Sequence, residues 1–142
     1  MNLKSFDKYR DHGLLLLRVG IGLMFITVHG WPKLAGGVQM WTGLGKTFNS
    51  LLGFSFIPVF WGLMATLSEF GGGWCLVSGA LFRPACVLML ITMSVAVAAN
   101  IRGGYGFAGA SQAFEMGVVF LSLIFIGPGR FTLPQLWRSR KR

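Results

Sequence analysis

The sequence predicts an all-α integral membrane protein, folded as a four-helix transmembrane bundle. Three observations lead to this prediction: an apolar composition, four long apolar runs, and basic residues gathered beside those runs. The 142 residues are 54% hydrophobic and only 12% charged, whereas soluble proteins are about 25% charged. A small water-soluble domain cannot hide this much apolar surface, so lipid is the solvent that fits the composition.

Four apolar runs are long enough to cross a bilayer, which takes about 20 residues in a helix. Pro32 and the Pro128-Gly129 pair are expected to end the first and last runs. Only Arg83 separates the second run from the third, which predicts a tight helical hairpin. The whole chain, 1–142, is then a single domain. The predicted spans are residues 14–31, 57–82, 84–101 and 111–127.

Basic residues are distributed unequally on the two sides of these predicted spans. One side has Lys4, Lys8, Arg10, Arg83, Arg130, Arg138, Arg140, Lys141 and Arg142. The other has only Lys33, Lys46 and Arg102. Basic residues concentrate on the cytoplasmic side of membrane proteins, so both termini are expected in the cytoplasm. The formal charge of +9 also suits a nucleic-acid-binding protein, but there the basic residues decorate a soluble fold. We therefore expect the lipid bilayer, and no nucleic acid, as a partner.

The connection between the first two spans is the longest. Within it, residues 38–52 carry apolar side chains three or four positions apart, including Trp41. This spacing favours a short helix lying in the outer membrane interface over an irregular loop. The second outer connection, 102–110, is glycine-rich and is expected to be a mobile loop. Its Gly104, Gly106 and Gly109 match a dinucleotide-binding pattern, but a membrane span precedes them where a strand is required.

Ionisable side chains inside a membrane span are costly, which makes each one a candidate for function. At about 100° per residue, Arg18, His29 and Lys33 share one stripe of the first predicted helix with Gly22 and Phe25. Glu69 lies near the middle of the second span. Its helix face carries small residues that allow close helix packing: Gly62, Ala65, Thr66, Gly72, Gly73 and Ala80. Both stripes are therefore expected to face the bundle interior.

Polar residues on the remaining two helices complete two predicted clusters. Met89, Met93, Ala96 and Asn100 share a stripe of the third helix, and Gln112, Glu115 and Ser122 share one of the fourth. An outer cluster would gather His29, Lys33, Asn100, Arg102 and Glu115. A deeper cluster would pair Arg18 with Glu69, because a carboxylate in hydrocarbon stays ionised only when it is paired.

These clusters have a functional and a structural interpretation. A water-accessible imidazole, ammonium and carboxylate group suits proton exchange. Alternatively, the ion pairs lock the helices in one register. The Met89/Met93 stripe and the cysteines Cys75 and Cys86 are expected to be core residues. His29 with one carboxylate nearby offers too few ligands for zinc or haem, so no metal is expected.

Several short motifs occur in a characteristic order: RVGIGLMF at 18–25, HGWPKL at 29–34, EFGGG at 69–73, then Gly79, Glu115 and GPGRFTL at 127–133. With these motifs the chain resembles the DoxX family of small bacterial membrane proteins over nearly its whole length. Pro134 stands where the family usually has an acidic residue. The resemblance implies a four-helix protein of the bacterial inner membrane. Some members are subunits of thiosulfate:quinone oxidoreductases, and others are linked to thiol or oxidative-stress systems.

The first functional hypothesis is a membrane subunit of a quinone-linked oxidoreductase. His29 or Lys33 would donate a hydrogen bond to a quinone carbonyl, and Glu115 would carry the accompanying proton. Arg18 and Glu69 would order the pocket floor or relay protons, Phe25 and Trp31 would stack on the ring, and Asn100 would contribute to binding. A pocket between helices, mainly apolar with a few polar groups, suits such a ligand.

Two other functions are alternatives from different classes. One is a non-catalytic scaffold that holds a soluble thiol-redox or metal-handling partner at the membrane, through the outer segment or the basic tail. The other is transport of a small solute, which requires a homo-oligomer because four short helices cannot enclose a pathway alone.

Overall fold

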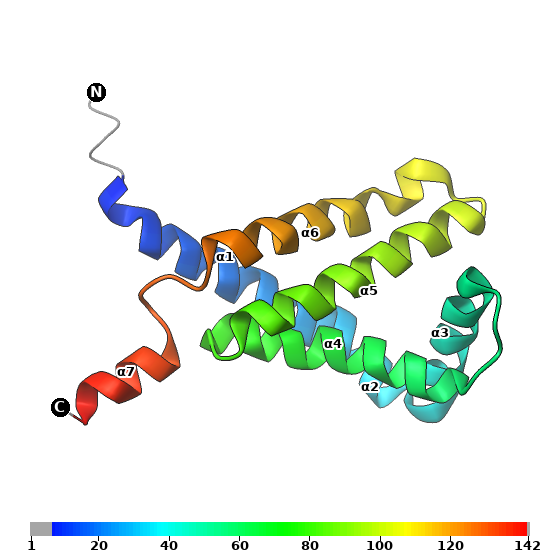
Figure 1. The fold of residues 1–142 in the computed structure, drawn as a ribbon, viewed down its shortest axis with the longest axis horizontal. Helices are drawn as coiled ribbons and strands as arrows, with labels where there is room; N and C mark the ends of the chain where they lie inside the picture. Colours follow the sequence, from blue (N-terminus) through cyan, green and yellow to red (C-terminus); the bar gives the residue numbers. More distant parts are fainter. Residues whose placement is uncertain (1–6, 142) are drawn as a thin grey trace.

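The computed structural model describes residues 7–141, and every regular element within this range is a helix (Figure 1). Three helical segments are long and apolar enough to cross a membrane: Asp7–Ala35, Phe82–Arg102 and Gly106–Ile126. The predicted all-α class is therefore confirmed. Lys4 and Arg142, two of the basic residues assigned to the cytoplasmic side, lie outside the described residues.

The first membrane-spanning segment is longer than predicted. Helix α1 (Arg10–Met24) continues through a π-helical turn, η2 (Phe25–Gly30), into α2 (Trp31–Ala35). The prediction that Pro32 ends this span is therefore wrong. Pro32 lies in the first turn of α2, directly after the π-helical turn, where the regular α-helical hydrogen-bond pattern is already interrupted. The span therefore includes Lys33, which lies beyond the predicted end of the span at residue 31.

The second and third predicted spans correspond to α4 (Pro58–Ser78) and α5 (Phe82–Arg102). Helix α4 is not among the three segments apolar enough to cross a membrane, since its middle contains Glu69 and three consecutive glycines. The turn that joins the two helices is centred on Gly79 and Leu81, both with positive φ. Arg83 was predicted to separate the two spans, but it belongs to the first turn of α5. Glycine suits position 79 also because a Cβ there would meet Thr132.

The fourth predicted span corresponds to α6 (Gly106–Ile126). It begins earlier than expected, since only Gly103, Gly104 and Tyr105 separate it from α5. The predicted mobile loop over 102–110 is therefore wrong. Gly104 and Gly106 have φ of +82° and +63°, a conformation open to glycine at no steric cost, and they make the turn tight. The other residues of the segment continue as helix.

A helix does occupy the first outer connection. Helix α3 (Gly37–Leu52) confirms the helical prediction for residues 38–52, while its location in a membrane interface stays a prediction. It packs antiparallel on the start of α4, with Gly45 against the carbonyl of Pro58 and Gly62 against the carbonyl of Trp41. A Cβ on either glycine would lie under 2 Å from those oxygens, so this approach requires glycine at both positions.

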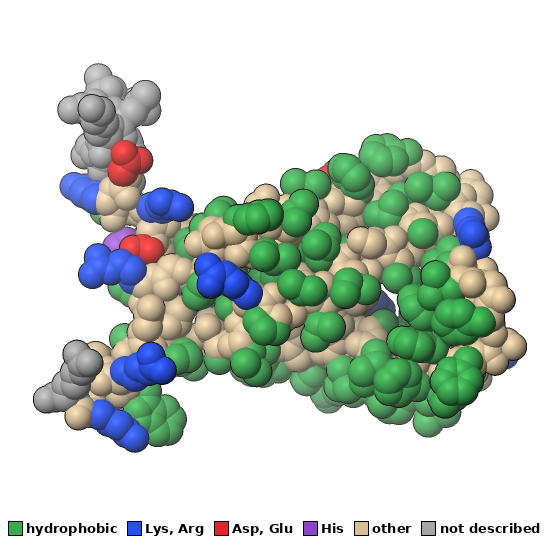
Figure 2. Space-filling model, in the orientation of Figure 1, with side chains coloured by type: hydrophobic (Ala, Val, Ile, Leu, Met, Phe, Trp, Pro, Cys, Tyr) green, Lys and Arg blue, Asp and Glu red, His purple; other side chains and the backbone are tan. Residues whose placement is uncertain are grey.

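The long helices pack in chain order. Helix α1 and η2 lie against α4, α4 against α5, and α5 against α6. The ring of Phe25 meets the ring of Phe120 at 5.3 Å between centroids, which joins η2 to α6. The shared core includes Cys86, Met89 and Met93, as expected for core residues. Apolar side chains also cover the outside of the helices, whereas basic side chains concentrate at one end (Figure 2).

The start of α1 and the C-terminal helix α7 (Leu133–Arg140) lie at that same end of the molecule (Figure 1). The rings of His12 and Phe131 are 4.8 Å apart between centroids. A carboxylate oxygen of Asp11 accepts a hydrogen bond from the backbone N–H of Arg130 at 3.2 Å. The start of α1 and the segment before α7 are therefore in contact, at the end of the molecule opposite α3 (Figure 1).

Candidate functional site

The site with the clearest chemistry is an ion pair between Lys33 of α2 and Glu69 of α4. The Lys33 Nζ donates a hydrogen bond to Glu69 Oε2. Within residues 7–141 it is the one salt bridge that the structure contains. The Glu69 side chain is only 3% exposed, while that of Lys33 is 26% exposed. The pair thus joins a buried carboxylate to a lysine whose side chain is partly exposed.

Three segments position this pair. Gly30, at the end of η2, lies directly against Phe70, and a Cβ on Gly30 would come within 2.6 Å of the Phe70 Cα. This contact places the end of the first span at the height of Glu69. Continuation of the helix beyond Pro32 then brings Lys33 over the carboxylate. From α3, the Trp41 indole N–H donates to the Lys33 carbonyl at 3.0 Å and holds the α2 backbone.

The aromatic residues near the pair differ in their exposure. His29 lies about one turn before Lys33 on the same stripe and is half-buried. Its ring is 4.9 Å from that of Phe25, which is itself buried in the core. Trp31, by contrast, is exposed, with its ring 6.4 Å from the ring of Phe70. Trp31 thus leaves an aromatic ring uncovered, on a different side of the helix from Lys33.

The predicted outer cluster of five residues does not form. Asn100 donates to the carbonyl of Ala96 in its own helix, and Arg102 donates to the carbonyl of Ser50 at the end of α3. Glu115 is exposed, with no hydrogen bond or ion pair to any described residue. Glu115 is exposed because α6 packs against the bundle with a different face from the one that carries Glu115. The buried residues of α6 are Ala110, Gly117, Phe120 and Leu123.

The predicted pairing of Arg18 with Glu69 is also wrong. Helix α1 is antiparallel to α4, with Gly22 against Gly73 and Gly30 against Phe70. Glu69 therefore lies at the height of Gly30. Arg18 is twelve residues earlier in the chain, or roughly 18 Å along a helix. That distance excludes direct contact.

Arg18 binds backbone carbonyls instead of a carboxylate. Its side chain is 1% exposed, and its guanidinium donates to the carbonyls of Pro128, Phe131 (2.8 Å) and Val77 (3.5 Å). The guanidinium carbon also lies 5.8 Å from the centroid of the Phe82 ring. Arg18 thus ties the segment that follows α6 to α1 and α4. Carbonyl acceptors give no side-chain signal, so the sequence could not indicate this contact.

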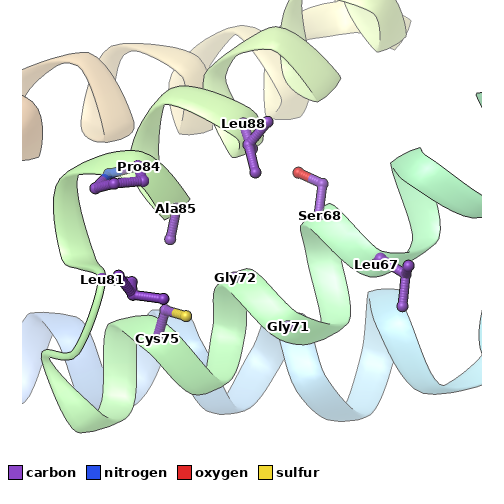
Figure 3. A pocket seen from close by; sticks show the side chains of 9 residues that line it. All are labelled: Leu67, Ser68, Gly71, Gly72, Cys75, Leu81, Pro84, Ala85 and Leu88. Atoms are coloured by element: carbon purple, nitrogen blue, oxygen red, sulfur yellow. The ribbon is translucent and has the colours of Figure 1, made fainter.

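Two cavities lie apart from the ion pair. One, of about 160 Å³, is an apolar hollow between α4 and α5 (Figure 3). Its lining comprises Leu67, Ser68, Gly71, Gly72, Cys75, Leu81, Pro84, Ala85 and Leu88. The other is an open groove of about 500 Å³ on the side of α3 that faces away from α4. Its lining comprises Gly36, Gln39, Met40, Gly43, Leu44 and Thr47. Neither is lined by His29, Lys33 or Glu69.

The arrangement supplies the groups that proton exchange requires. In the described part of the chain, no three His, Cys, Asp or Glu side chains converge. Glu69 offers a carboxylate, Lys33 can donate hydrogen bonds to a carbonyl, and the His29 imidazole can donate or accept a hydrogen bond. A buried carboxylate joined to a partly exposed ammonium offers a route between the surface and the interior.

Comparison with known proteins identifies the family. A family model described as DoxX matches residues 13–102, from the start of α1 to the end of α5. Searches of curated proteins and of solved structures found no match. The matched region covers well over half of the chain and includes both members of the ion pair. The chain therefore belongs to the DoxX family and is a multi-pass membrane protein.

Proposed function

We propose that this chain is the membrane subunit of a quinone-linked oxidoreductase, and that Lys33, Glu69 and His29 form its proton-exchanging site. The observation that carries the proposal is the Lys33–Glu69 ion pair, since a carboxylate that is only 3% exposed is costly in a membrane protein and marks a functional group by default. When bound, a quinone accepts two electrons and two protons. An electron-donating partner supplies the electrons.

The residues of the chain have separate roles in this proposal. The Lys33 ammonium and the His29 imidazole donate hydrogen bonds to a carbonyl of the quinone. The Lys33 ammonium passes a proton to the Glu69 carboxylate and is left as a neutral amine, which takes up the next proton through its partly exposed side chain; the protonated Glu69 then gives its proton to the reduced quinone. Trp31, exposed two positions before Lys33 in the chain, offers an aromatic face. A few convergent polar groups within apolar surroundings are typical of small-molecule sites.

The test measures quinone bound to the purified protein after mild detergent extraction. We expect the unmodified chain to retain quinone, and His29→Ala and Lys33→Gln to lose most of it. His29→Ala removes a hydrogen-bond donor, and Lys33→Gln replaces the long charged donor with a shorter, uncharged amide. Lys46→Gln is the matched control, since Lys46 is exposed on α3 and has no role in the site. Glu115→Gln locates the site, because only a site that extends to α6 would lose quinone in this variant. Retention of quinone by both His29→Ala and Lys33→Gln would contradict the proposal.

The open groove on α3 supports a second candidate function, that of a scaffold for a soluble redox or metal-handling partner. Gln39, Met40, Leu44 and Thr47 present a mixed polar and apolar surface on the side of α3 away from α4. A partner bound there does not require the ion pair. A partner retained by Lys33→Gln and lost on Leu44→Asp, with no quinone in any sample, would favour this function over the first.

The proposed site also implies a topology, in which α4 is a fourth membrane span. Its 21 residues are long enough to cross the apolar core, and it packs along α1 and η2, which lie within a candidate span. The contacts of His12 with Phe131 and of Asp11 with Arg130 support an even number of spans. The basic residues at that end support a topology with both termini in the cytoplasm, in a protein of the bacterial inner membrane.

Reporter fusions test this topology. We expect a cytoplasmic reporter to be active, and a periplasmic reporter inactive, when fused at either terminus. A fusion within 103–105, between α5 and α6, is the internal control and should show the reverse pattern. Three spans instead of four would place the two termini on opposite sides and give opposite reporter activities at the two ends.

A further inference from the structure

Helix α7 has an apolar side that the rest of the protein leaves uncovered. Leu133, Leu136 and Trp137 lie within about 100° of one another on this helix. They are 61%, 55% and 69% exposed. Lys141 and Arg138 follow this stripe on its Trp137 side and are exposed as well. Such a helix, with an apolar stripe and basic residues beside it, is typical of segments that lie on a membrane surface.

The start of α7 is held firmly against the bundle. Thr132 caps the helix, because its hydroxyl accepts the N–H of Gln135 at 3.4 Å. The Thr132 side chain is itself buried and lies against Gly79, at the turn between α4 and α5. One residue earlier, the carbonyl of Phe131 accepts a hydrogen bond from Arg18. The position of the helix start is therefore set by the protein and not by a free linker.

This position lies near the membrane boundary. Helix α6, a candidate membrane span, ends at Ile126, and six residues separate it from Leu133. Six residues span at most about 20 Å, and the contacts of this segment keep it close to α1. Helix α7 therefore begins within reach of the lipid headgroups that surround the end of the bundle.

The charge at this end favours an anionic lipid surface. Two carboxylates, those of Asp7 and Asp11, are present among the described residues there. The basic side chains are more numerous: Lys8, Arg10, Arg83, Arg130, Arg138 and Lys141 (Figure 2). Each lysine or arginine near an anionic membrane surface strengthens binding by about 1 kcal/mol, or about fivefold.

We propose that α7 lies in the headgroup region of the adjacent leaflet and binds anionic phospholipid. Leu133, Leu136 and Trp137 enter the boundary of the acyl chains, and Arg138 and Lys141 contact lipid phosphates. A protein partner fits this surface less well, because eight residues of helix extend only about 12 Å. One stripe of that length is much smaller than the roughly 800 Å² that each partner buries in a standard protein interface.

The test follows the fluorescence of Trp137 in the full-length protein, reconstituted in nanodiscs whose lipids carry bromine near the headgroup end of the acyl chains. One set contains phosphatidylcholine alone, and the other also contains phosphatidylglycerol. The Trp137 signal is the difference between the unmodified chain and Trp137→Phe. Trp74, exposed on α4, gives a reference signal through Trp74→Phe.

We expect bromine to quench Trp137 more strongly when phosphatidylglycerol is present. The double variant Arg138→Gln/Lys141→Gln should lose this dependence on lipid charge, and the Trp74 signal should respond equally in both lipid mixtures. Emission from Trp137 that resembles emission in water and is not quenched in either mixture would overturn the proposal. Quenching that is independent of both lipid charge and the two basic residues would also overturn it.

Discussion

Replacement of Arg18 with methionine is expected to release the segment after α6. The free energy of unfolding should fall by on the order of 3 kcal/mol, because three backbone carbonyls lose their donor and each unsatisfied buried group costs about 1–3 kcal/mol. Those carbonyls belong to Val77, Pro128 and Phe131. Burial of a guanidinium also has a cost, but the Phe82 ring beside it and the three acceptors offset that cost. The loss of hydrogen bonds should therefore dominate.

Two measurements check this expectation: thermal unfolding in detergent, and amide hydrogen exchange over residues 127–132. Exchange there should become faster in Arg18→Met, with a partial recovery in Arg18→Lys, which keeps the charge but loses the planar fork. Arg83→Met is the matched control. Arg83 is exposed and donates to a single carbonyl, that of Ile124, so its removal should change stability little. Equal effects of the two substitutions, with no change in exchange, would show that Arg18 does not hold the segment.

Much of the fold was predictable, because membrane helices follow from the length of apolar runs and from the residues that end them. The predictions were wrong where a proline or glycine, which usually ends a helix, lies within a helical segment. Pro32 is tolerated because a π-helical turn ends just before it and a new helical turn begins there. Glycine-rich residues after α5 were predicted as a loop, although only Gly104 and Gly106 serve the turn. Residue type alone does not distinguish these uses.

The site was harder to predict than the fold. Helical periodicity places Arg18, His29 and Lys33 on one stripe and turns Glu69 inward, and each of these side chains is buried or half-buried in the structure. Periodicity gives the angle of a residue around its own helix, but not the height of one helix against another. That height depends on the contacts of Gly22 with Gly73 and of Gly30 with Phe70. Glu69 consequently pairs with Lys33 instead of Arg18.

The second large effect concerns the ion pair, and it should be asymmetric. In Lys33→Met, Glu69 is left 97% buried without its cation, and a buried pair broken in this way typically costs about 3–5 kcal/mol. In Glu69→Gln the loss should be smaller, because the more exposed Lys33 ammonium can turn toward water and the amide can still accept a hydrogen bond. The double variant Lys33→Met/Glu69→Met should recover most of the stability, since replacement of both charges by apolar groups is often neutral. Thermal unfolding of the four proteins checks the order.

Exchange of the two charges separates a structural role of this pair from the proposed function. Lys33→Glu/Glu69→Lys keeps an ion pair between α2 and α4, so stability should exceed that of Lys33→Met. Quinone retention should nevertheless stay low, because the exposed position then carries an acceptor and no longer a donor, while the interior carries an ammonium where proton exchange requires a carboxylate. If the exchanged protein regains both stability and quinone, the pair acts by holding α2 against α4, and neither residue serves as a specific donor or proton carrier.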